Sequence, residues 1–246
     1  FFDPVAYLFE EPENLLKQEL REPSVYNSII AAIAGGASRV NEIATKVGLD
    51  SSSCMKYLHV LRDLGIVIKE SSFAEKNTKK TIYLVDDNFF RFWYRFVPQN
   101  LSMIQAGRTA QIYEKTIKPY YAQYMGLIFE KICKDYLLRY AKDLPVLPTA
   151  IGQWWGSDAS TRKQIQIDIV CSCAEQNEFL IGSCKYRNEA VGCEELALLK
   201  QYAEVFRAGA KFHYLIFSKS GFTDALQSIA KNENINLITL EDLYKS

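Results

Sequence analysis

Two strand-like runs stand in the second half of the chain, and the first of them alternates apolar with other positions. Over residues 165–170, Ile165, Ile167 and Ile169 alternate with other residues, and a second strand-like run covers 179–185 after a polar turn. A period of two is typical of a half-buried β-strand. The sequence therefore predicts a β-hairpin in this region.

Further strands and helices are predicted around this hairpin. A strand at 150–155 precedes it, helical spacing follows over 194–207 and 223–231, and strand-like runs cover 211–217 and 235–239. The residues expected to face inward on the first of these helices are Leu198, Leu199, Tyr202 and Phe206. Three successive strands followed by helix–strand pairs predict an α/β core with helices on both faces.

The hairpin carries polar side chains that suggest chemistry. Asp168 falls in the middle of a strand, where a carboxylate is disfavoured. Ser183 and Lys185 are two residues apart, so both leave the same face of their strand. Pairing the two strands would bring a carboxylate, a hydroxyl and an ammonium together. The plain alternative is an Asp168–Lys185 ion pair that bridges neighbouring strands.

A long helix is predicted over 120–144, with Phe129, Ile132 and Tyr136 along one apolar edge. Glu130 is the one charge in an adjoining stripe that also holds Gly126, Cys133 and Leu137. A carboxylate in such a stripe lowers stability unless it faces a cleft. Either Glu130 faces a site, or it bends outward to Lys134.

The first half of the chain predicts helices followed by a β-hairpin. A helix over 13–21 is followed by one that begins after Pro23 and buries Ile29, Ile30 and Ile33. Ser38 is expected to cap a third helix that carries Val40, Ile43, Ala44 and Val47. Gly48 turns the chain, and Asp50 is expected to cap a fourth helix with an inward face made of Cys54, Leu58, Leu61 and Leu64.

Two strand-like runs, 66–70 and 81–85, follow this fourth helix and flank a lysine-bearing loop. Helix, tight turn, helix and hairpin in this order predict a winged helix-turn-helix. The residues that would lead the recognition helix into a DNA groove are Ser51, Ser52, Ser53, Met55 and Lys56. The loop would offer three lysines to phosphates, namely Lys76, Lys79 and Lys80.

Charge alone does not decide between DNA and protein as the partner of this region. Residues 50–80 contain six basic and four acidic side chains, a modest surplus for a phosphate-binding surface. The next segment, 86–97, is rich in aromatic residues and holds Arg91 and Arg95 one turn apart. It predicts a buried helix with both arginines reaching solvent, and base stacking is the alternative. Residues 99–118 predict a helix that links the two halves.

Composition excludes several classes of protein. The 246 residues contain 29 Lys+Arg and 29 Asp+Glu, so no overall charge attracts nucleic acid or membrane. The six cysteines form no CxxC, which predicts free, mostly buried thiols in a reducing cytoplasm. No phosphate-binding GxxxxGK[ST] loop and no apolar run long enough to span a membrane occurs. Because the chain starts at Phe1 without a signal-peptide pattern, we expect a fragment of a longer protein.

Several stretches together resemble a known family. EEPENLLKQELREP, FFRFWYRFV, GLIFEKICKDYL, QIDIV and GSCKYRNE are similar to the C-terminal region of the archaeal-type P-loop ATPases, an AAA-related family. The resemblance implies an α+β winged helix-turn-helix followed by an α/β restriction-endonuclease-like core of the PD-(D/E)XK type. The implied divisions are a linker from a missing ATPase domain (1–22), a winged helix (23–97), a helical connector (98–118) and a nuclease-like domain (119–246).

The resemblance also implies a degenerate nuclease-like site. In PD-(D/E)XK enzymes an Asp and the Glu of a Glu-X-Lys motif hold Mg²⁺, and the Lys positions the nucleophile. The matching residues are Asp168 and Lys185, with Ser183 at the Glu position. Glu130 matches a helical Glu used by resolvase-type members. Asp168 and Glu130 would hold Mg²⁺ weakly, and Gln166 replaces an acidic residue often found two positions before the Asp.

Three hypotheses of function follow. The first is a cytoplasmic DNA-binding and regulatory module of an ATPase whose missing N-terminal domain binds ATP, with no cofactor in this chain. The second is a Mg²⁺-dependent DNA endonuclease that uses Glu130, Asp168 and Lys185. The third is a protein-interaction scaffold coupled to the ATPase.

Overall fold

The computed structural model describes residues 1–73, 81–139, 144–158, 161–175 and 177–245. The chain forms two compact units. Unit 1 comprises Phe1–Ser71 and Asn77–Tyr120, and unit 2 comprises Ser72–Lys76 and Tyr121–Ser246. The three loop lysines predicted to contact phosphates, Lys76, Lys79 and Lys80, lie outside the described residues.

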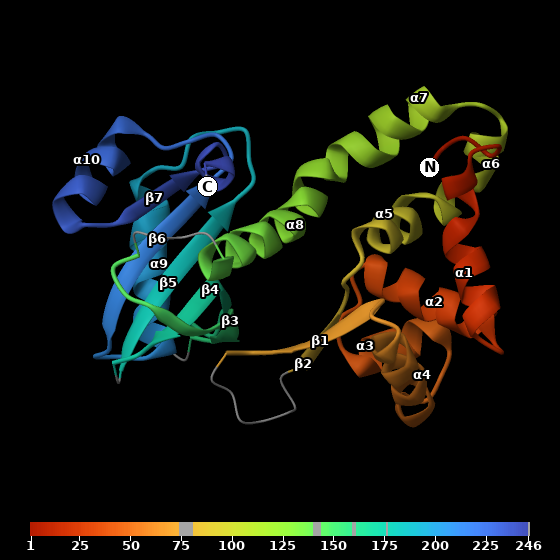
Figure 1. Cartoon of the computed structure of the whole chain (residues 1–246), viewed down its shortest axis with the longest axis horizontal. Helices are drawn as coiled ribbons and strands as arrows, with labels where there is room; N and C mark the ends of the chain where they lie inside the picture. The colour runs from red at the N-terminus through yellow and green to blue at the C-terminus, as the bar shows by residue number, and fades with distance from the viewer. Residues whose placement is uncertain (74–80, 140–143, 159–160, 176, 246) are drawn as a thin grey trace. The chain divides into compact units, whose positions relative to one another are not determined.

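Unit 1 consists of helices and one two-stranded sheet (Figure 1). Its antiparallel strands pair in register from Val67↔Val85 to Ser71↔Thr81. In chain order the elements are α1 (Glu11–Glu19), α2 (Pro23–Ala34), α3 (Val40–Val47), α4 (Ser51–Asp63), β1 (Val67–Ser71), β2 (Thr81–Val85), α5 (Asn88–Phe96), α6 (Leu101–Gln105), α7 (Thr109–Ile112) and a π-helical turn Tyr113–Ile117.

Local capping explains where α3 and α4 begin. Asp50 caps α4 as predicted, because its Oδ1 accepts a hydrogen bond of 2.9 Å from the backbone N–H of Ser53. The prediction that Ser38 caps α3 is wrong. The N-cap is Arg39, and Glu42 Oε2 accepts from the N–H groups of Ser38 (3.0 Å) and Arg39 (3.1 Å). The glutamate in the first turn thus reaches back to backbone donors at and before the N-cap, as in the reverse half of a capping box.

The apolar stripes predicted for unit 1 form its core, with one exception. Ile29, Ile30, Ile43 and Leu58 are fully buried. Leu64, however, is 39% exposed, because α4 ends at Asp63 and Leu64 is already its C-cap residue. The inward stripe therefore stops one turn earlier than the apolar spacing indicated.

The aromatic helix α5 is part of the same core, which argues against base stacking. Phe90, Trp93, Tyr94 and Phe96 are buried, and the indole Nε1 of Trp93 donates to a backbone carbonyl at 2.6 Å. Arg91 and Arg95 are both partly exposed, and the guanidinium Nε of Arg91 also donates to the Val85 carbonyl at 2.9 Å. The chain beyond α5 is also not one continuous helix. Gly107 adopts φ 69°, a left-handed conformation that separates α6 from α7.

Unit 2 is built on a five-stranded mixed sheet in the order β3-β4-β5-β6-β7. β3, β4 and β5 pair antiparallel, whereas β6 and β7 join in parallel after crossover helices. The elements are α8 (Lys118–Arg139), β3 (Pro148–Ser157), β4 (Gln164–Cys173), β5 (Glu178–Lys185), α9 (Cys193–Phe206), β6 (Lys211–Ser218), α10 (Asp224–Glu233) and β7 (Asn236–Thr239).

Helices cover both faces of this sheet, as the sequence predicted (Figure 1). On one face α9 and α10 pack on residues such as Ile181, and on the other α8 packs through Phe129, Cys133 and Leu137. The inward stripe of α9 differs from the prediction, because Leu198 is 39% exposed. Its buried residues are Glu195, Leu196, Leu199 and Ala203. Ile132 on α8 is likewise exposed and does not form the predicted apolar edge.

A β-bulge interrupts the alternation of β4 at Asp168. Gly152 pairs with Val170 and Trp154 pairs with Ile167, so β4 has one residue more than β3 between these two pairs. Ile167 and Val170 consequently both face α9, and Ile169 faces α8. Bulges re-aim side chains and are frequent beside functional sites.

Two negative expectations concern the membrane and the cysteines. No helix in the described part of the chain is both long and apolar enough to cross a membrane. All six cysteines are free, and five of them are buried, as predicted.

Candidate functional site

Asp168 is positioned where β4 and β5 separate. The ladder between these strands ends at the pair Ile169↔Gly182. Beyond it, Asp168 Oδ2 accepts a hydrogen bond of 2.9 Å from the backbone N–H of Cys184. The carboxylate therefore replaces the backbone acceptor that a continuing ladder would supply, which explains why an acid is tolerated within this strand.

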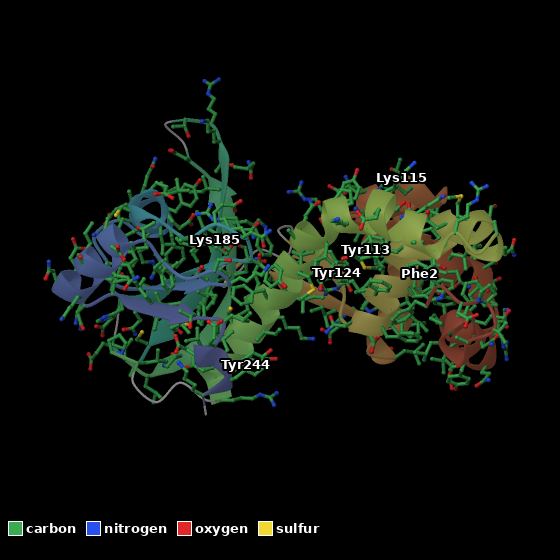
Figure 2. All side chains as sticks on the ribbon, turned by 90° about the horizontal axis from the view of Figure 1, so that it is seen from above. Phe2, Tyr113, Lys115, Tyr124, Lys185 and Tyr244 are labelled. Carbon is green, nitrogen blue, oxygen red and sulfur yellow. The ribbon has the colours of Figure 1, made fainter. Side chains whose placement is uncertain are left out.

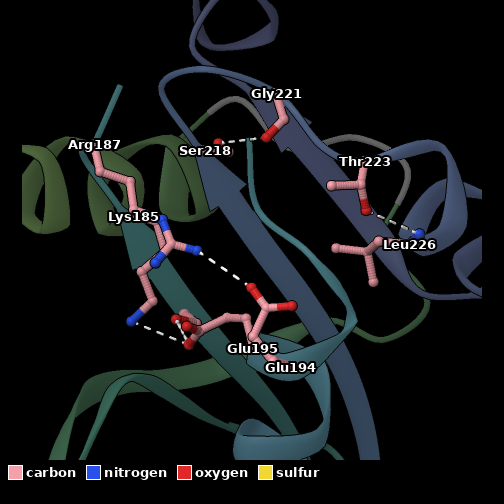
Figure 3. A network of polar contacts seen from close by, with 9 residues as sticks. Lys185, Arg187, Glu194, Glu195, Ser218, Gly221, Thr223 and Leu226 are labelled. Carbon is pink, nitrogen blue, oxygen red and sulfur yellow. Dashed lines mark hydrogen bonds and ion pairs between the residues drawn. The ribbon is translucent and has the colours of Figure 1, made fainter. Parts of the chain in front are cut away.

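Ser183 and Lys185 leave β5 on the same face and share one partner, Glu195 of α9. The Ser183 hydroxyl donates to Glu195 Oε1 at 2.8 Å, and the Lys185 ammonium lies 3.0 Å from the same oxygen (Figure 3). Ser183 and Glu195 are both buried. A carboxylate thus lies beside position 183 although the residue at 183 carries none. Lys185 thus forms its ion pair with Glu195, whereas the alternative prediction paired it with Asp168.

Glu130 reaches the same region from α8. Its Oε2 accepts a hydrogen bond of 2.8 Å from the side-chain amide of Gln153, a buried residue of β3. Glu130 is partly buried, and the negative charge of Asp168 raises its pKa. We call Glu130, Asp168, Lys185 and Glu195 the carboxylate–lysine cluster. Figure 2 shows Lys185 within unit 2.

The protonation equilibria of the cluster reflect a surplus of negative charge. Burial, and then the charge of Asp168, raise the pKa of Glu130 to about 8, against the opposing effect of Lys134. Burial also raises the pKa of Asp168, although Lys185 and the Cys184 N–H act to lower it. Burial acts to lower the pKa of Lys185, but Asp168 and Glu195 outweigh it and the pKa is raised. Glu130 and Asp168 therefore favour binding of a proton or a cation.

Mg²⁺ is the cation whose ligand preference fits two of these groups. It usually keeps several waters and binds one or two protein carboxylates, and Glu130 and Asp168 can serve as such a pair. Glu195 Oε1 is already engaged by Ser183 and Lys185. Within the described ranges, no three His, Cys, Asp or Glu side chains are placed to hold a metal together. The cluster fits a water-rich Mg²⁺ site and not a cage of protein ligands.

Sequence reasoning missed Glu195 and Gln153. Acidic residues in the first turn of a helix are ordinary, because they interact favourably with its positive end, so Glu194 and Glu195 gave no special signal. One signal was present: Glu195 stands four residues before Leu199 and eight before Ala203, on one helix face. A carboxylate on an apolar helix face indicates that it borders a site, and this argument applies to Glu195 as it does to Glu130 on α8.

A second candidate surface lies in unit 1 at the start of α4. A groove of about 710 Å³ is lined by Arg39, Val40, Asn41, Ser51, Ser52, Met55, Lys56, His59 and Thr81. Ser52 and Lys56, both predicted to contact nucleic acid, lie here and are exposed. Ser53 does not line the groove, and its backbone N–H is bound to the cap residue Asp50. Met55 is turned partly toward Tyr83, whose hydroxyl lies 3.2 Å from its sulfur. We call this surface the α4 groove.

Comparison with known proteins gives a relative and a family. The chain is 34% identical over 206 residues to the uncharacterized protein MJECL04 of Methanocaldococcus jannaschii, a match that covers 82% of this chain. It spans 44% of that relative, which is therefore more than twice as long as the matched segment.

Two solved structures are similar to the chain over nearly its whole length at 10% identity. Protein VC1899 from Vibrio cholerae matches 96% of this chain and 52% of its own, with a TM-score of 0.36. Can2 from Sulfobacillus thermosulfidooxidans, in complex with cyclic tetra-adenylate, matches 98% and 54%, with a TM-score of 0.30.

The segment that matches a family includes the carboxylate–lysine cluster. Glu130, Gln153, Asp168, Lys185 and Glu195 all lie between residues 93 and 196, whereas the α4 groove lies outside this segment. Over residues 93–196 the chain matches the DUF234 family, described as archaeal and bacterial proteins of unknown function.

Proposed function

We propose that the chain is a DNA-binding module of a larger protein, and that its α4 groove contacts the duplex. The observation that carries this proposal is the composition of the groove. Three side chains that can carry positive charge, Arg39, Lys56 and His59, surround the exposed hydroxyls at the start of α4. Phosphate groups are bound by such cations and hydroxyls and by helix N-termini.

The order of elements in unit 1 supports this use of α4. A helix that follows a tight turn and is followed by a hairpin is the recognition helix in winged helix-turn-helix proteins. The turn before α4 contains Gly48 at φ 77°, a left-handed conformation that favours glycine. The first turn of α4 is held by its Asp50 cap. Ser51, Ser52 and Lys56 would then enter the groove of the duplex.

The larger protein is proposed to be a P-loop ATPase that binds ATP in a domain outside this chain. Support comes from the resemblance of the sequence to the C-terminal region of such ATPases. It also comes from the length of the matched relative, of which this chain spans less than half. A GxxxxGK[ST] motif in the full-length protein is the expected finding, and its absence there would remove the ATPase from the proposal.

The binding experiment compares two lysine substitutions of equal charge. Lys56→Ala should weaken binding of a short fluorescent duplex about threefold to tenfold, since a phosphate contact is lost. Lys46→Ala is the matched control, because Lys46 is exposed on α3 but does not line the groove. Equal effects of the two substitutions would contradict specific use of the α4 groove, and protein contact would become the better explanation.

A second function, Mg²⁺-dependent cleavage of DNA, is favoured by Glu195. This residue brings a carboxylate to Ser183 and Lys185, at the place where the Glu-X-Lys motif would have one. When bound by Glu130 and Asp168, Mg²⁺ would activate a water and neutralise the phosphate. Glu195 would keep Lys185 oriented, and Gln153 would keep Glu130 oriented. Cleavage should be slow, because Lys185 is already paired.

The experiment for cleavage relocates the carboxylate. Ser183→Glu alone would place a second carboxylate against Glu195, because the Ser183 hydroxyl lies 2.8 Å from Glu195 Oε1. The double variant Ser183→Glu with Glu195→Ser keeps one carboxylate in that space and moves it onto β5. We expect it to bind Mg²⁺ or Mn²⁺ more tightly by calorimetry and to nick supercoiled DNA faster than the unmodified chain. Unchanged metal affinity, together with no nicking by either protein, would contradict the hypothesis that the chain cleaves DNA.

A further inference from the structure

The loop after β5 is held in place at both of its ends. The backbone N–H of Lys219 donates to the Lys185 carbonyl at 3.0 Å, and the Ser220 hydroxyl donates to the Arg187 carbonyl at 2.7 Å. At the far end, Val191 and Phe222 form a parallel bridge. This loop follows the carboxyl end of β5, which is parallel to β6, and ligands of α/β sheets bind at such strand ends.

Arg187 projects from this loop beside Lys185, toward the first turn of α9 (Figure 3). Its guanidinium lies 3.7 Å from Glu194 Oε1, just as Lys185 lies 3.0 Å from Glu195 Oε1. The separation of 3.7 Å is too long for a hydrogen bond. The Arg187 side chain is 40% exposed and that of Glu194 is 73% exposed, so water and solutes reach the pair.

The guanidinium of Arg187 has a hydrogen-bond donor that no described residue satisfies. An arginine side chain has five N–H donors, and its Nε is buried without an acceptor among the residues that the structure describes. A buried donor without an acceptor lowers stability. The charged contact that the guanidinium makes with Glu194 is long and solvated, so a stronger anion can replace it.

We propose that Arg187 binds a phosphate group of the nucleic acid at the carboxylate–lysine cluster, and that Glu194 occupies it in the free chain. This inference rests on the proposed cleavage of DNA at the carboxylate–lysine cluster, which requires that the cluster contact nucleic acid. A phosphate presents several acceptor oxygens to the planar fork of a guanidinium, which binds it through two parallel hydrogen bonds. Glu194 is a replaceable partner, because its carboxylate is solvated and makes no close hydrogen bond to the guanidinium.

Gly192 gives an independent way to disturb this pair. A Cβ atom at position 192 would lie 2.3 Å from the Glu194 carboxylate oxygen Oε2, so an alanine there would displace the carboxylate. The φ of Gly192 is −106°, which alanine adopts without strain. Gly192→Ala and Glu194→Gln therefore weaken the same ion pair by different routes, one steric and one electrostatic.

The test measures binding of a short fluorescent duplex in Ca²⁺, so that cleavage does not interfere. Arg187→Gln should weaken binding about tenfold and reduce the slope of log affinity against log salt by about 1. Arg187→Lys should lie between, because an ammonium keeps the charge but loses the fork. Glu194→Gln and Gly192→Ala should each strengthen binding about threefold. Thermal unfolding of each variant checks that the fold is intact.

The outcomes separate this proposal from the proposed function. If Lys56→Ala weakens binding and Arg187→Gln does not, the α4 groove binds DNA and the role of Arg187 is overturned. Equal loss in Arg187→Gln and Arg187→Lys, with no gain in Glu194→Gln, would make Arg187 structural and also overturn it. Failure of the unmodified chain to bind duplex DNA would overturn both proposals.

Discussion

The α4 groove of unit 1 and the carboxylate–lysine cluster of unit 2 are built in opposite ways. In the groove, Arg39, Ser52 and Lys56 are exposed side chains that line a common hollow. In the cluster, Glu195 is buried and engaged by Ser183 and Lys185, and Asp168 is bonded to the backbone of β5. The groove thus presents solvated side chains, whereas in the cluster neighbouring charges shift the pKa values of Glu130, Asp168 and Lys185.

Unit 2 holds a second charge cluster, around Glu178, that can be compared with the carboxylate–lysine cluster. At the start of β5, Glu178 Oε1 lies 2.7 Å from both Lys211 and His213. Hydrogen bonds from His213 and Lys211 lower the pKa of Glu178, although burial opposes them. At the other end of the sheet, the pKa values of Glu130 and Asp168 are raised. Glu178 thus has two basic partners on one oxygen and a lowered pKa, whereas Glu130 and Asp168 have raised pKa values, and groups with strongly perturbed pKa values are frequent at functional sites.

The largest effect is expected from removal of the shared cation. Lys185→Met should lower the free energy of unfolding by about 3 kcal/mol at pH 8, because it leaves Glu195 buried without a counter-ion. Adding Glu195→Gln should recover part of the loss, since an amide needs no counter-ion. Urea unfolding of the single and double variants measures both effects.

Lys211→Met is the matched control at the other end of β5. Lys211 is largely exposed and Glu178 keeps His213, so the loss should be clearly smaller. Equal losses of unfolding free energy in Lys185→Met and Lys211→Met would contradict the contrast between the two charge clusters.

The next effect concerns the dependence of stability on pH. Glu130 has its pKa raised to about 8 in the folded chain, so folding favours its protonated form. Its contribution to stability is present below the pKa of the unfolded chain, near 4.5, and is lost as pH rises through about 8. Glu130→Gln should remove this loss and raise stability at pH 8 by about 2 kcal/mol, a discounted value because Glu130 is only partly buried.

Glu178→Gln should change the pH profile in the opposite direction. The lowered pKa of Glu178 gives stability that is present above its unfolded pKa and lost as pH falls through the folded value. Its removal should therefore cost stability at pH 7 and flatten the acid limb. Unfolding curves between pH 4 and pH 9 for both variants test this. A Glu130→Gln variant whose stability falls toward pH 8 as steeply as that of the unmodified chain would show that Glu130 is not the titrating group.

A smaller effect separates the cap of α4 from its charge. Asp50→Asn keeps an oxygen that can accept from the Ser53 N–H, and it removes a negative charge beside the groove. Duplex affinity should rise roughly threefold. Asp50→Ala removes the same charge together with the cap, so its affinity should lie below that of Asp50→Asn. Fluorescence anisotropy measures the difference, and identical affinities would mean that the capped first turn of α4 does not position the contacts.

The sequence predicted most elements because their signals are local. Period-two alternation located β4, a short strand-like apolar run located β5, and apolar spacing with Asp50 and Gly48 located α3 and α4. It could not give the bulge at Asp168, which depends on the pairing of β4 with β3. Glu195 was missed for the same reason, since its meaning comes from contact with Ser183 twelve residues earlier. Of the residues predicted to contact DNA, Ser52 and Lys56 line the α4 groove, whereas Ser53 does not and its backbone N–H is bound to the cap residue Asp50.

The most direct test of the central claim is the salt dependence of duplex binding by the unmodified chain and by Lys56→Ala. If the α4 groove contacts phosphates, log affinity should fall linearly with log salt concentration. Lys56→Ala should lower that slope by about 1, and Lys46→Ala should leave it unchanged. Binding that does not depend on salt, or equal slopes for the unmodified chain and Lys56→Ala, would contradict the account.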